Sequence, residues 1–282
     1  MSHSVHQDQA ASLRRILRPA ALRVLPVAGA DAVLRATVVL NLATAAAQAG
    51  HQVVVLDQSH GDVAAALGLT VRHELLDLIE GRRRFAETAL AAPEGVRVLP
   101  GARGMAALAA EGARPEALFG AFLRIDQPAD LVLVNVADPA TAGALMPGGA
   151  GEVLLAAATD VEALTGAYAV IKQLALANGL KSYRLVLSGG APSGTAATAT
   201  VAANLAWTAR RFVGARVLHA STIPDDAQLA RAAAAREAVV RVAPRTPAAV
   251  AFTALAGALA DWDAFELDAA SGAGAAAAAL AQ

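Results

Sequence analysis

The chain of 282 residues contains no cysteine, and its only two lysines are Lys172 and Lys181. The lack of cysteine excludes disulfides, thiolate metal sites and cysteine nucleophiles, and it is typical of cytosolic proteins. The six histidines show no metal-ligand spacing such as HExxH. We therefore expect a cytoplasmic protein without a metal site of its own.

An excess of charge of one sign is also missing, as are long uncharged apolar runs. The 23 basic and 24 acidic residues give a net charge of -1, so no overall basic excess favours binding to nucleic acid or to an anionic membrane. Asp31 and Arg35 interrupt the longest apolar stretch, residues 24–47, which leaves it short of the roughly 18 uncharged residues of a membrane span. Arg23 interrupts the apolar region that a signal peptide would need. The sequence therefore predicts neither a membrane span nor a signal peptide.

Apolar residues are abundant. They make up 56% of the chain, whereas charged residues make up 17%, and this balance excludes intrinsic disorder. Aromatic residues contribute only 4%, and much of the apolar surplus is alanine. We therefore expect a helix-rich core of small, closely packed side chains.

Short β-rich runs alternate with longer helical runs along most of the chain. Several of the β-rich runs, such as VVVL and LVLV, are continuously apolar, which suits strands buried on both faces of a parallel sheet. The alternation predicts an α/β fold with a doubly wound, mostly parallel sheet and helices on both faces. The expected strands are 22–28, 52–57, 96–99, 130–136, 152–158, 183–188 and 216–221. The expected helices are 33–48, 71–79, 115–124, 161–178, 196–212, 227–235 and 247–262.

Three regions follow from this pattern. Residues 1–20 contain a short amphipathic helix, residues 21–267 form the α/β domain, and residues 268–282 form a low-complexity, alanine-rich tail.

The first strand–helix connection is where a doubly wound fold usually cradles a phosphate. Such a loop needs several glycines, a lysine for the phosphates and a Ser or Thr for magnesium. Residues 28–43 read AGADAVLRATVVLNLA, with Gly29 as the loop's glycine and Asp31 placed where its carboxylate would face the phosphates. Arg35 is cationic, but its planar guanidinium does not replace a compact ammonium group.

This segment resembles the frame GKGGVGKT…NLA of the deviant Walker-A ATPases of the MinD/ParA family. Gly29 matches the start of the frame and residues 41–43 match its end. The signature lysine falls on Ala30, the catalytic-loop lysine on Arg35 and the magnesium-binding threonine on Ala36, next to Thr37. The resemblance implies a P-loop NTPase fold of the MinD/ParA type, in which most of the nucleotide chemistry is lost.

Later landmarks of the same family lie in the same order. Asp57 matches the aspartate of the second strand, but Ser59 stands where the resemblance implies a water-positioning aspartate. Asn135 occupies the Walker-B aspartate position, and an amide cannot carry the charge that holds a magnesium shell. We therefore expect feeble ATP hydrolysis at most, no catalytic residues and no cofactor. The remnant nucleotide pocket then consists of Gly29, Arg35, Thr37, Asp57 and Asn135.

An alternative is a divergent but active ATPase that binds ATP or ADP with magnesium. In that hypothesis Arg35 and Thr37 replace the lost lysine and threonine of the phosphate loop. A third hypothesis, a ParA-type protein that binds DNA, is disfavoured by the near-zero net charge.

The segment Asp8-Gln9-Ala10-Ala11-Ser12-Leu13-Arg14 resembles the DQAxxLR motif of the FlhG/FleN class of flagellar-number regulators. In that class this N-terminal helix binds the signal-recognition-type GTPase FlhF and stimulates GTP hydrolysis. A glutamine can orient an attacking water, and an arginine can stabilise developing phosphate charge. The resemblance implies the partner-binding residues Asp8, Gln9, Ala10, Leu13, Arg14 and Leu17. The alternative is an ordinary amphipathic helix that folds back on its own domain.

The remaining partners follow less directly. A flagellar C-ring component and a flagellar transcription regulator are further candidates, and the chain could be a monomer or a homodimer. Membrane binding is doubtful because Asp261, Asp263 and Glu266 surround Trp262 and Phe265, which we expect to pack in the core.

Two other motifs have simple structural explanations. The glycine-rich segment 189–195 lacks a lysine and is predicted to be a turn. Asp225 and Asp226 precede a helix, and we expect them to cap its N-terminus.

Overall fold

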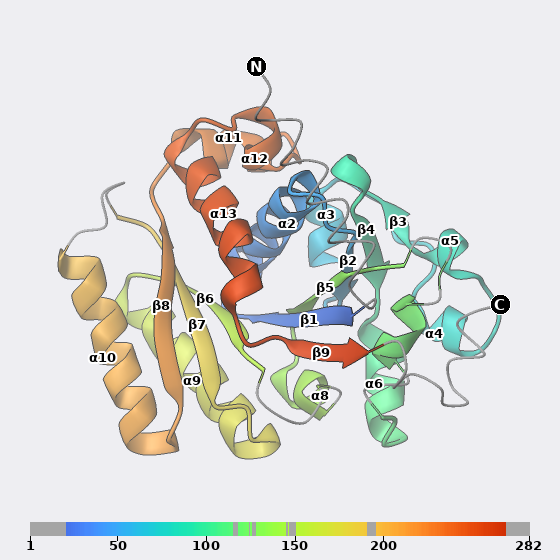
Figure 1. Cartoon of the computed structure of the whole chain (residues 1–282), viewed down its shortest axis with the longest axis horizontal. Coiled ribbons are helices and arrows are strands. Elements are labelled where there is room, and N and C mark those ends of the chain that lie inside the picture. Colours follow the sequence, from blue (N-terminus) through green and yellow to red (C-terminus); the bar gives the residue numbers. More distant parts are fainter. Residues whose placement is uncertain are drawn as a thin grey trace, which may run out of the picture.

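The computed structural model describes residues 21–114, 118–123, 125, 128–144, 146, 151–190 and 196–268. Within these residues the strands form one nine-stranded sheet in the order β3-β4-β2-β5-β1-β6-β7-β8, and β9 also pairs with β1. Only β3 and β9 are antiparallel to their partners among the described strands. The doubly wound sheet expected from the sequence is therefore confirmed (Figure 1).

The strands of the described residues are β1 (Ala21–Ala28), β2 (Val53–Asp57), β3 (Leu90–Ala91), β4 (Arg97–Pro100), β5 (Leu131–Val136), β6 (Val153–Ala158), β7 (Ser182–Ser188), β8 (Arg216–Ile223) and β9 (Phe265–Asp268).

Helices cover both faces of the sheet because successive strand residues point to opposite faces, and each face has its own apolar cluster. One face is covered by α4 (Leu75–Ile79), α5 (Phe85–Thr88), α6 (Ala102–Ala110), α8 (Pro139–Ala144), α9 (Val161–Asn178) and α10 (Ala196–Val213). The other face is covered by α2 (Ala32–Gln48), α3 (Asp62–Ala66), α11 (Ala227–Ala234), α12 (Val239–Val242) and α13 (Pro247–Ala258). The 3₁₀ helices are η1 (Pro93–Gly95), η2 (Gly120–Leu123) and η3 (Leu259–Asp261).

Strand β1 is central and has an unusual edge. β5 pairs along one side of it, from Arg23 to Ala28. The other side is divided, because β6 pairs with Val27 and Ala28 whereas β9 pairs with residues 21–24. The carboxyl end of β1 therefore lies between β5 and β6, and the amino end is covered by the last strand of the fold.

The long predicted elements are present with small differences at their ends. α4 begins at Leu75 rather than at 71, because Glu74 and Asp77 form a capping box that starts the helix there. The helix expected over 115–124 lies partly outside the described residues, and η2 occupies its described end. The sequence did not predict β3, β9, α3, α5, α6, α8 or α12, of which α6, with nine residues, is the longest. β9 also carries the sheet to Asp268, one residue past the predicted domain boundary.

Trp262 and Phe265 are buried, as the sequence predicted, and their exposed fractions are 8% and 3%. No helix in the described ranges combines the length and the apolar character that crossing a bilayer requires.

Candidate functional site

The candidate site lies at the carboxyl ends of β1, β2 and β5, where doubly wound folds bind their ligands. Asp57 is the last residue of β2, and its partner in register is Asn135 of β5. Asn135 in turn lies opposite Val27 of β1. The parallel register therefore brings Gly29, Asp57 and Asn135 to one end of the sheet, as the sequence predicted.

The connection from β1 to α2 consists of Gly29, Ala30 and Asp31 alone, because α2 already begins at Ala32. In the sequence frame, positions 32–34 belong to the phosphate loop, but here they form the first turn of the helix. A phosphate loop needs consecutive free N–H groups that point at one anion. A connection this short does not provide them.

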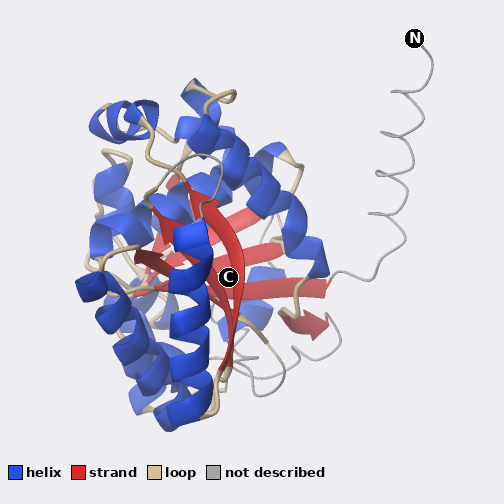
Figure 2. Cartoon of the chain, turned by 90° about the vertical axis from the view of Figure 1, so that its left-hand side faces the viewer, coloured by secondary structure: helices blue, strands red, loops and turns tan. Residues whose placement is uncertain are grey.

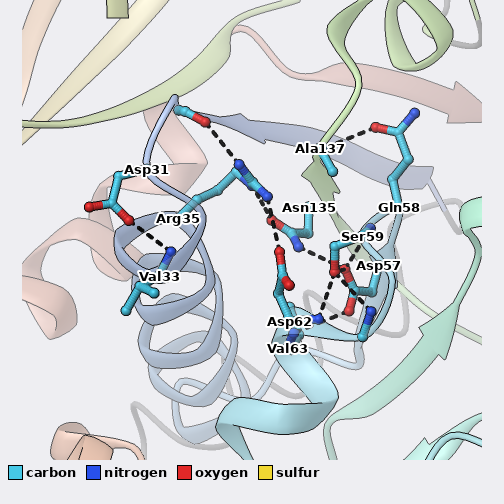
Figure 3. A network of polar contacts seen from close by, with 12 residues as sticks. Asp31, Val33, Arg35, Asp57, Gln58, Ser59, Asp62, Val63, Asn135 and Ala137 are labelled. Atoms are coloured by element: carbon cyan, nitrogen blue, oxygen red, sulfur yellow. Dashed lines mark hydrogen bonds and ion pairs between the residues drawn. The ribbon is translucent and has the colours of Figure 1, made fainter. Parts of the chain in front are cut away.

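Asp31 occupies the anion position at the start of α2 (Figure 3). Its Oδ1 accepts hydrogen bonds from the N–H groups of Val33 at 2.8 Å and Leu34 at 3.0 Å. A helix N-terminus attracts anions because its first N–H groups lack partners and its dipole is positive there. The sequence predicted that the Asp31 carboxylate would face bound phosphates. Instead, it accepts hydrogen bonds from the N–H groups of α2 that would have bound them.

Gly29 fixes how closely this connection approaches the sheet. A Cβ atom at position 29 would lie 2.6 Å from the carbonyl oxygen of Ala156 in β6. Ala30 lies equally close to α9, since a Cβ atom on Gly166 would be 2.7 Å from the Ala30 Cβ. The connection is thus held tightly between β6 and α9, and glycine is required because it has no side chain.

Arg35 turns inward beneath the connection and is only 4% exposed. Its Nε donates to Oδ1 of Asn135 at 2.8 Å, and its Nη1 donates to the Gly29 carbonyl at 2.9 Å. Its Nη2 forms an ion pair with Asp62 at 3.3 Å. Burial lowers the pKa of Arg35, and the nearby carboxylates, Asp62 foremost, oppose that shift. All three guanidinium nitrogens therefore bind protein atoms.

Asp57 is completely buried beside this arginine (Figure 3). Its Oδ1 accepts from Nδ2 of Asn135 at 2.7 Å and from Oγ and N of Ser59 at 2.6 Å and 3.0 Å. Its Oδ2 accepts from the Val63 N–H at 3.2 Å. Burial raises the pKa of Asp57, while these hydrogen bonds act in the opposite direction. Both carboxylate oxygens are thus occupied.

Asn135 is the link between the two charged residues. Its amide nitrogen donates to Asp57 and its amide oxygen accepts from Arg35, so the hydrogen bonds run from Asp57 through Asn135 and Arg35 to Asp62. An aspartate at this position could not donate to Asp57 in its charged form.

Thr37 is not part of this network. Its hydroxyl donates to the carbonyl of Val33, one turn earlier, at 2.8 Å. Its side chain lines a cleft of about 260 Å³ between α2, α3 and α11. Of the predicted remnant pocket, the structure therefore brings together Gly29, Arg35, Asp57 and Asn135, and it places Thr37 elsewhere.

Sequence reasoning missed Gln58 and Asp62 as polar residues of this region, and it did not predict what Ser59 does here. Asp62 pairs with Arg35, and Gln58 accepts the N–H groups of Ala137 and Asp138 at 3.0 Å each. Ser59 also accepts the Asp62 N–H at 2.7 Å, which ties α3 to β2. The signal present in the sequence is Gly61, which lies between Ser59 and Asp62 and whose φ of 109° favours glycine.

The residues present do not fit ATP with magnesium. The N-terminus of α2 is occupied by Asp31, each guanidinium nitrogen of Arg35 binds a protein atom, and both oxygens of Asp57 accept hydrogen bonds. In the part of the chain that the structure describes, no three His, Asp or Glu side chains gather in an arrangement that could hold a metal ion.

The other predicted sites have different outcomes. Asp8, Gln9, Ala10, Leu13, Arg14 and Leu17 lie outside the described residues. Asp226 caps α11 as predicted, whereas Asp225 accepts the N–H of Gly190 at 3.1 Å. Gly189 and Gly190 have φ values of 111° and 91°, as expected for a turn.

Comparison with known proteins then places this geometry in a family. No family model matches the sequence. The antiactivator FleN of Pseudomonas aeruginosa is 32% identical over 238 residues, which cover 83% of this chain and 84% of FleN. The chain belongs to the FleN family. As a FleN-family member, it is a flagellar regulator built on a MinD-like fold.

Solved structures agree with this fold. MinD of Aquifex aeolicus has a TM-score of 0.61 at 18% identity, covering 85% of this chain and 97% of MinD. MinD of Pyrococcus horikoshii, solved in complex with Mg-ADP, has a TM-score of 0.57 at 18% identity and covers 83% of this chain and 94% of its own. At this identity the likeness establishes the fold alone.

Proposed function

We propose that the protein regulates flagellar number or placement as a scaffold that has lost ATP hydrolysis. The observation that carries this proposal is the position of Arg35, which joins Gly29, Asn135 and Asp62 beneath a connection of three residues. In an ATPase of this fold, a nucleotide and its metal would organise the same strand ends. Here, side chains of the protein hold them together.

In this proposal, the N-terminal segment binds the partner and stimulates its GTP hydrolysis. Asp8, Gln9, Leu13 and Arg14 would bind an FlhF-type GTPase, and Gln9 would orient the water that attacks GTP. A flagellar C-ring component or transcription regulator would be a further partner of the folded domain. Because no nucleotide is needed, the oligomeric state, monomer or homodimer, would not change with ATP.

Calorimetry with the whole chain tests the loss of nucleotide binding. We expect no heat of binding from ATP or ADP with magnesium, for the natural chain or for Arg35→Lys, which restores a lysine at the matching position of the family frame. Micromolar binding accompanied by turnover would establish the alternative, an active divergent ATPase that uses Arg35 and Thr37.

A GTPase assay with an FlhF-type partner tests the role in trans. We expect the whole chain to accelerate GTP turnover and Gln9→Ala to lose most of that acceleration. Gln7→Ala lies in the same segment outside the motif and is the matched control, with no expected loss. Equal stimulation by both variants would refute the role of Gln9 while leaving the calorimetric result untouched.

A further inference from the structure

The outer face of α10 carries an exposed pair of aromatic rings. Trp207 and Phe212 are 65% and 66% exposed, and their rings meet edge to face with centroids 6.4 Å apart. The only other tryptophan of the chain, Trp262, is buried. Two large apolar side chains that lie against each other and stay exposed make this position a candidate site of contact with another molecule.

The stretch of chain that contains this aromatic pair has charged residues of one sign only. Residues 163–224 contain no aspartate or glutamate, although they contain two lysines and four arginines. Arg184 and Arg216 are held by the buried carboxylate of Glu152. The remaining four, Lys172, Lys181, Arg210 and Arg211, are exposed, and none of them forms an ion pair with another described residue.

Lys172 lies on α9, and Trp207, Arg210, Arg211 and Phe212 lie on α10, whereas Lys181 lies in the connection between α9 and β7. α9 and α10 cover the same face of the sheet, and Lys172 and Trp207 both point away from it, since each is exposed. Figure 2, which views this side, shows α10 in the foreground. We call Lys172, Lys181, Trp207, Arg210, Arg211 and Phe212 the basic aromatic face.

The shape of α10 indicates what kind of molecule this face would meet. Thr200, Ala203 and Asn204 are exposed small side chains one and two turns before Trp207 on the same side of the helix. This row of small side chains would let a second helix pack closely against α10, with Trp207 and Phe212 at the end of the row. A flat bilayer does not need such a row for its contact, so the shape favours an elongated protein segment over a membrane.

We propose that the basic aromatic face binds an amphipathic helix of a partner protein whose polar residues are acidic. Apolar side chains of that helix contact Trp207 and Phe212, and its carboxylates pair with Arg210 and Arg211. Tryptophan and arginine are the residues that most often dominate binding energy in interfaces. None of its residues belongs to the N-terminal segment that the proposed function assigns to the GTPase partner.

The test measures binding of a defined probe to the whole chain by fluorescence anisotropy. The probe is a labelled synthetic helix with leucines at i, i+3, i+4 and i+7 and glutamates elsewhere. We expect saturable binding that weakens as salt is added. Trp207→Ala and the double variant Arg210→Glu/Arg211→Glu each lower the affinity at least about tenfold, equivalent to about 1.4 kcal/mol. The same leucine pattern with lysines in place of glutamates does not bind.

The matched control is Arg72→Glu/Arg83→Glu, which makes the same charge change at exposed arginines without ion pairs among the described residues. It lowers the affinity by less than about twofold, which is the small effect expected from the change in net charge alone. Circular dichroism confirms that each variant is folded. Equal losses for the two double variants, or no binding of the acidic probe, overturn the proposal. Binding to phosphatidylglycerol vesicles that Arg210→Glu/Arg211→Glu abolishes, without binding of the probe, assigns the face to a membrane instead.

Discussion

The Nε atom of Arg35 lies 2.8 Å from Oδ1 of Asn135, and both side chains are buried. This contact joins the first turns of α2 to the end of β5, where the fold's relatives would hold a nucleotide and its metal. A guanidinium is always charged, and it can donate in several fixed directions at once. It can therefore replace an external ligand as the group that organises the surrounding oxygen atoms.

Replacing Arg35 with methionine should destabilise the protein strongly. The substitution keeps much of the buried volume but leaves the oxygens of Gly29 and Asn135 without their donors. We expect the free energy of unfolding to fall by about 3 kcal/mol, as for the loss of one partner of a buried charged network. Urea denaturation measures this, with Arg83→Met as the exposed control, for which little change is expected. An unchanged midpoint for Arg35→Met would show that the network adds nothing to stability.

Replacing Asn135 with aspartate, which restores the family's residue, should make stability fall more steeply with pH. The new carboxylate would face Asp57, whose Oδ1 lies 2.7 Å from the present amide nitrogen. Burial already raises the pKa of Asp57, and a second negative charge raises it further. When the pKa of a carboxyl group is higher in the folded state than in the unfolded state, the protein loses folding stability as the pH rises between the two values.

The deficit of Asn135→Asp relative to the natural chain should therefore grow between about pH 5 and about pH 7.5. Urea denaturation at both pH values measures it, and the exposed Asn204→Asp is the control. A deficit that is the same at both values would mean that the two carboxylates do not interact.

Replacing Gly29 with alanine should destabilise the fold, because its Cβ atom would lie 2.6 Å from the Ala156 carbonyl oxygen. Overpacking of this kind costs about 1–3 kcal/mol. Gly257→Ala is the matched control, since α13 leaves open space around that position. It should instead stabilise the helix by about 0.5–1 kcal/mol. Thermal unfolding of the two variants should shift in opposite directions, and a shift in the same direction would contradict the close approach at β6.

Replacing Asp31 with alanine should remove the cap of α2. We expect a loss of about 1 kcal/mol, and only a few tenths for Asp31→Asn, because asparagine caps as well as aspartate. Denaturant unfolding of the two variants separates the capping hydrogen bonds from the charge. If both variants lost the same stability, the charge of Asp31 would matter more than its hydrogen bonds.

Much of this fold could be predicted because its signals are local. Continuous apolar runs and helical periodicity determined the long strands and helices, and the parallel register then placed Asp57 beside Asn135. β9 could not be predicted, because a strand of four residues is formed only by pairing with β1. The direction of Arg35 was also hidden, since the predicted helix 33–48 contains this residue without showing which way its side chain points. Its contacts with Gly29, Asn135 and Asp62 join segments far apart in the sequence.

β9 has a practical consequence for the chain as a whole. Because Ala21 pairs with Asp268, both ends of the described fold leave the sheet from adjacent positions. A short peptide linker could therefore join them without disturbing β1, and new termini could be opened at the exposed turn around Gly179, between α9 and β7. Such a circular permutant would keep the sheet and the arginine network while moving the chain ends to the edge that carries α10.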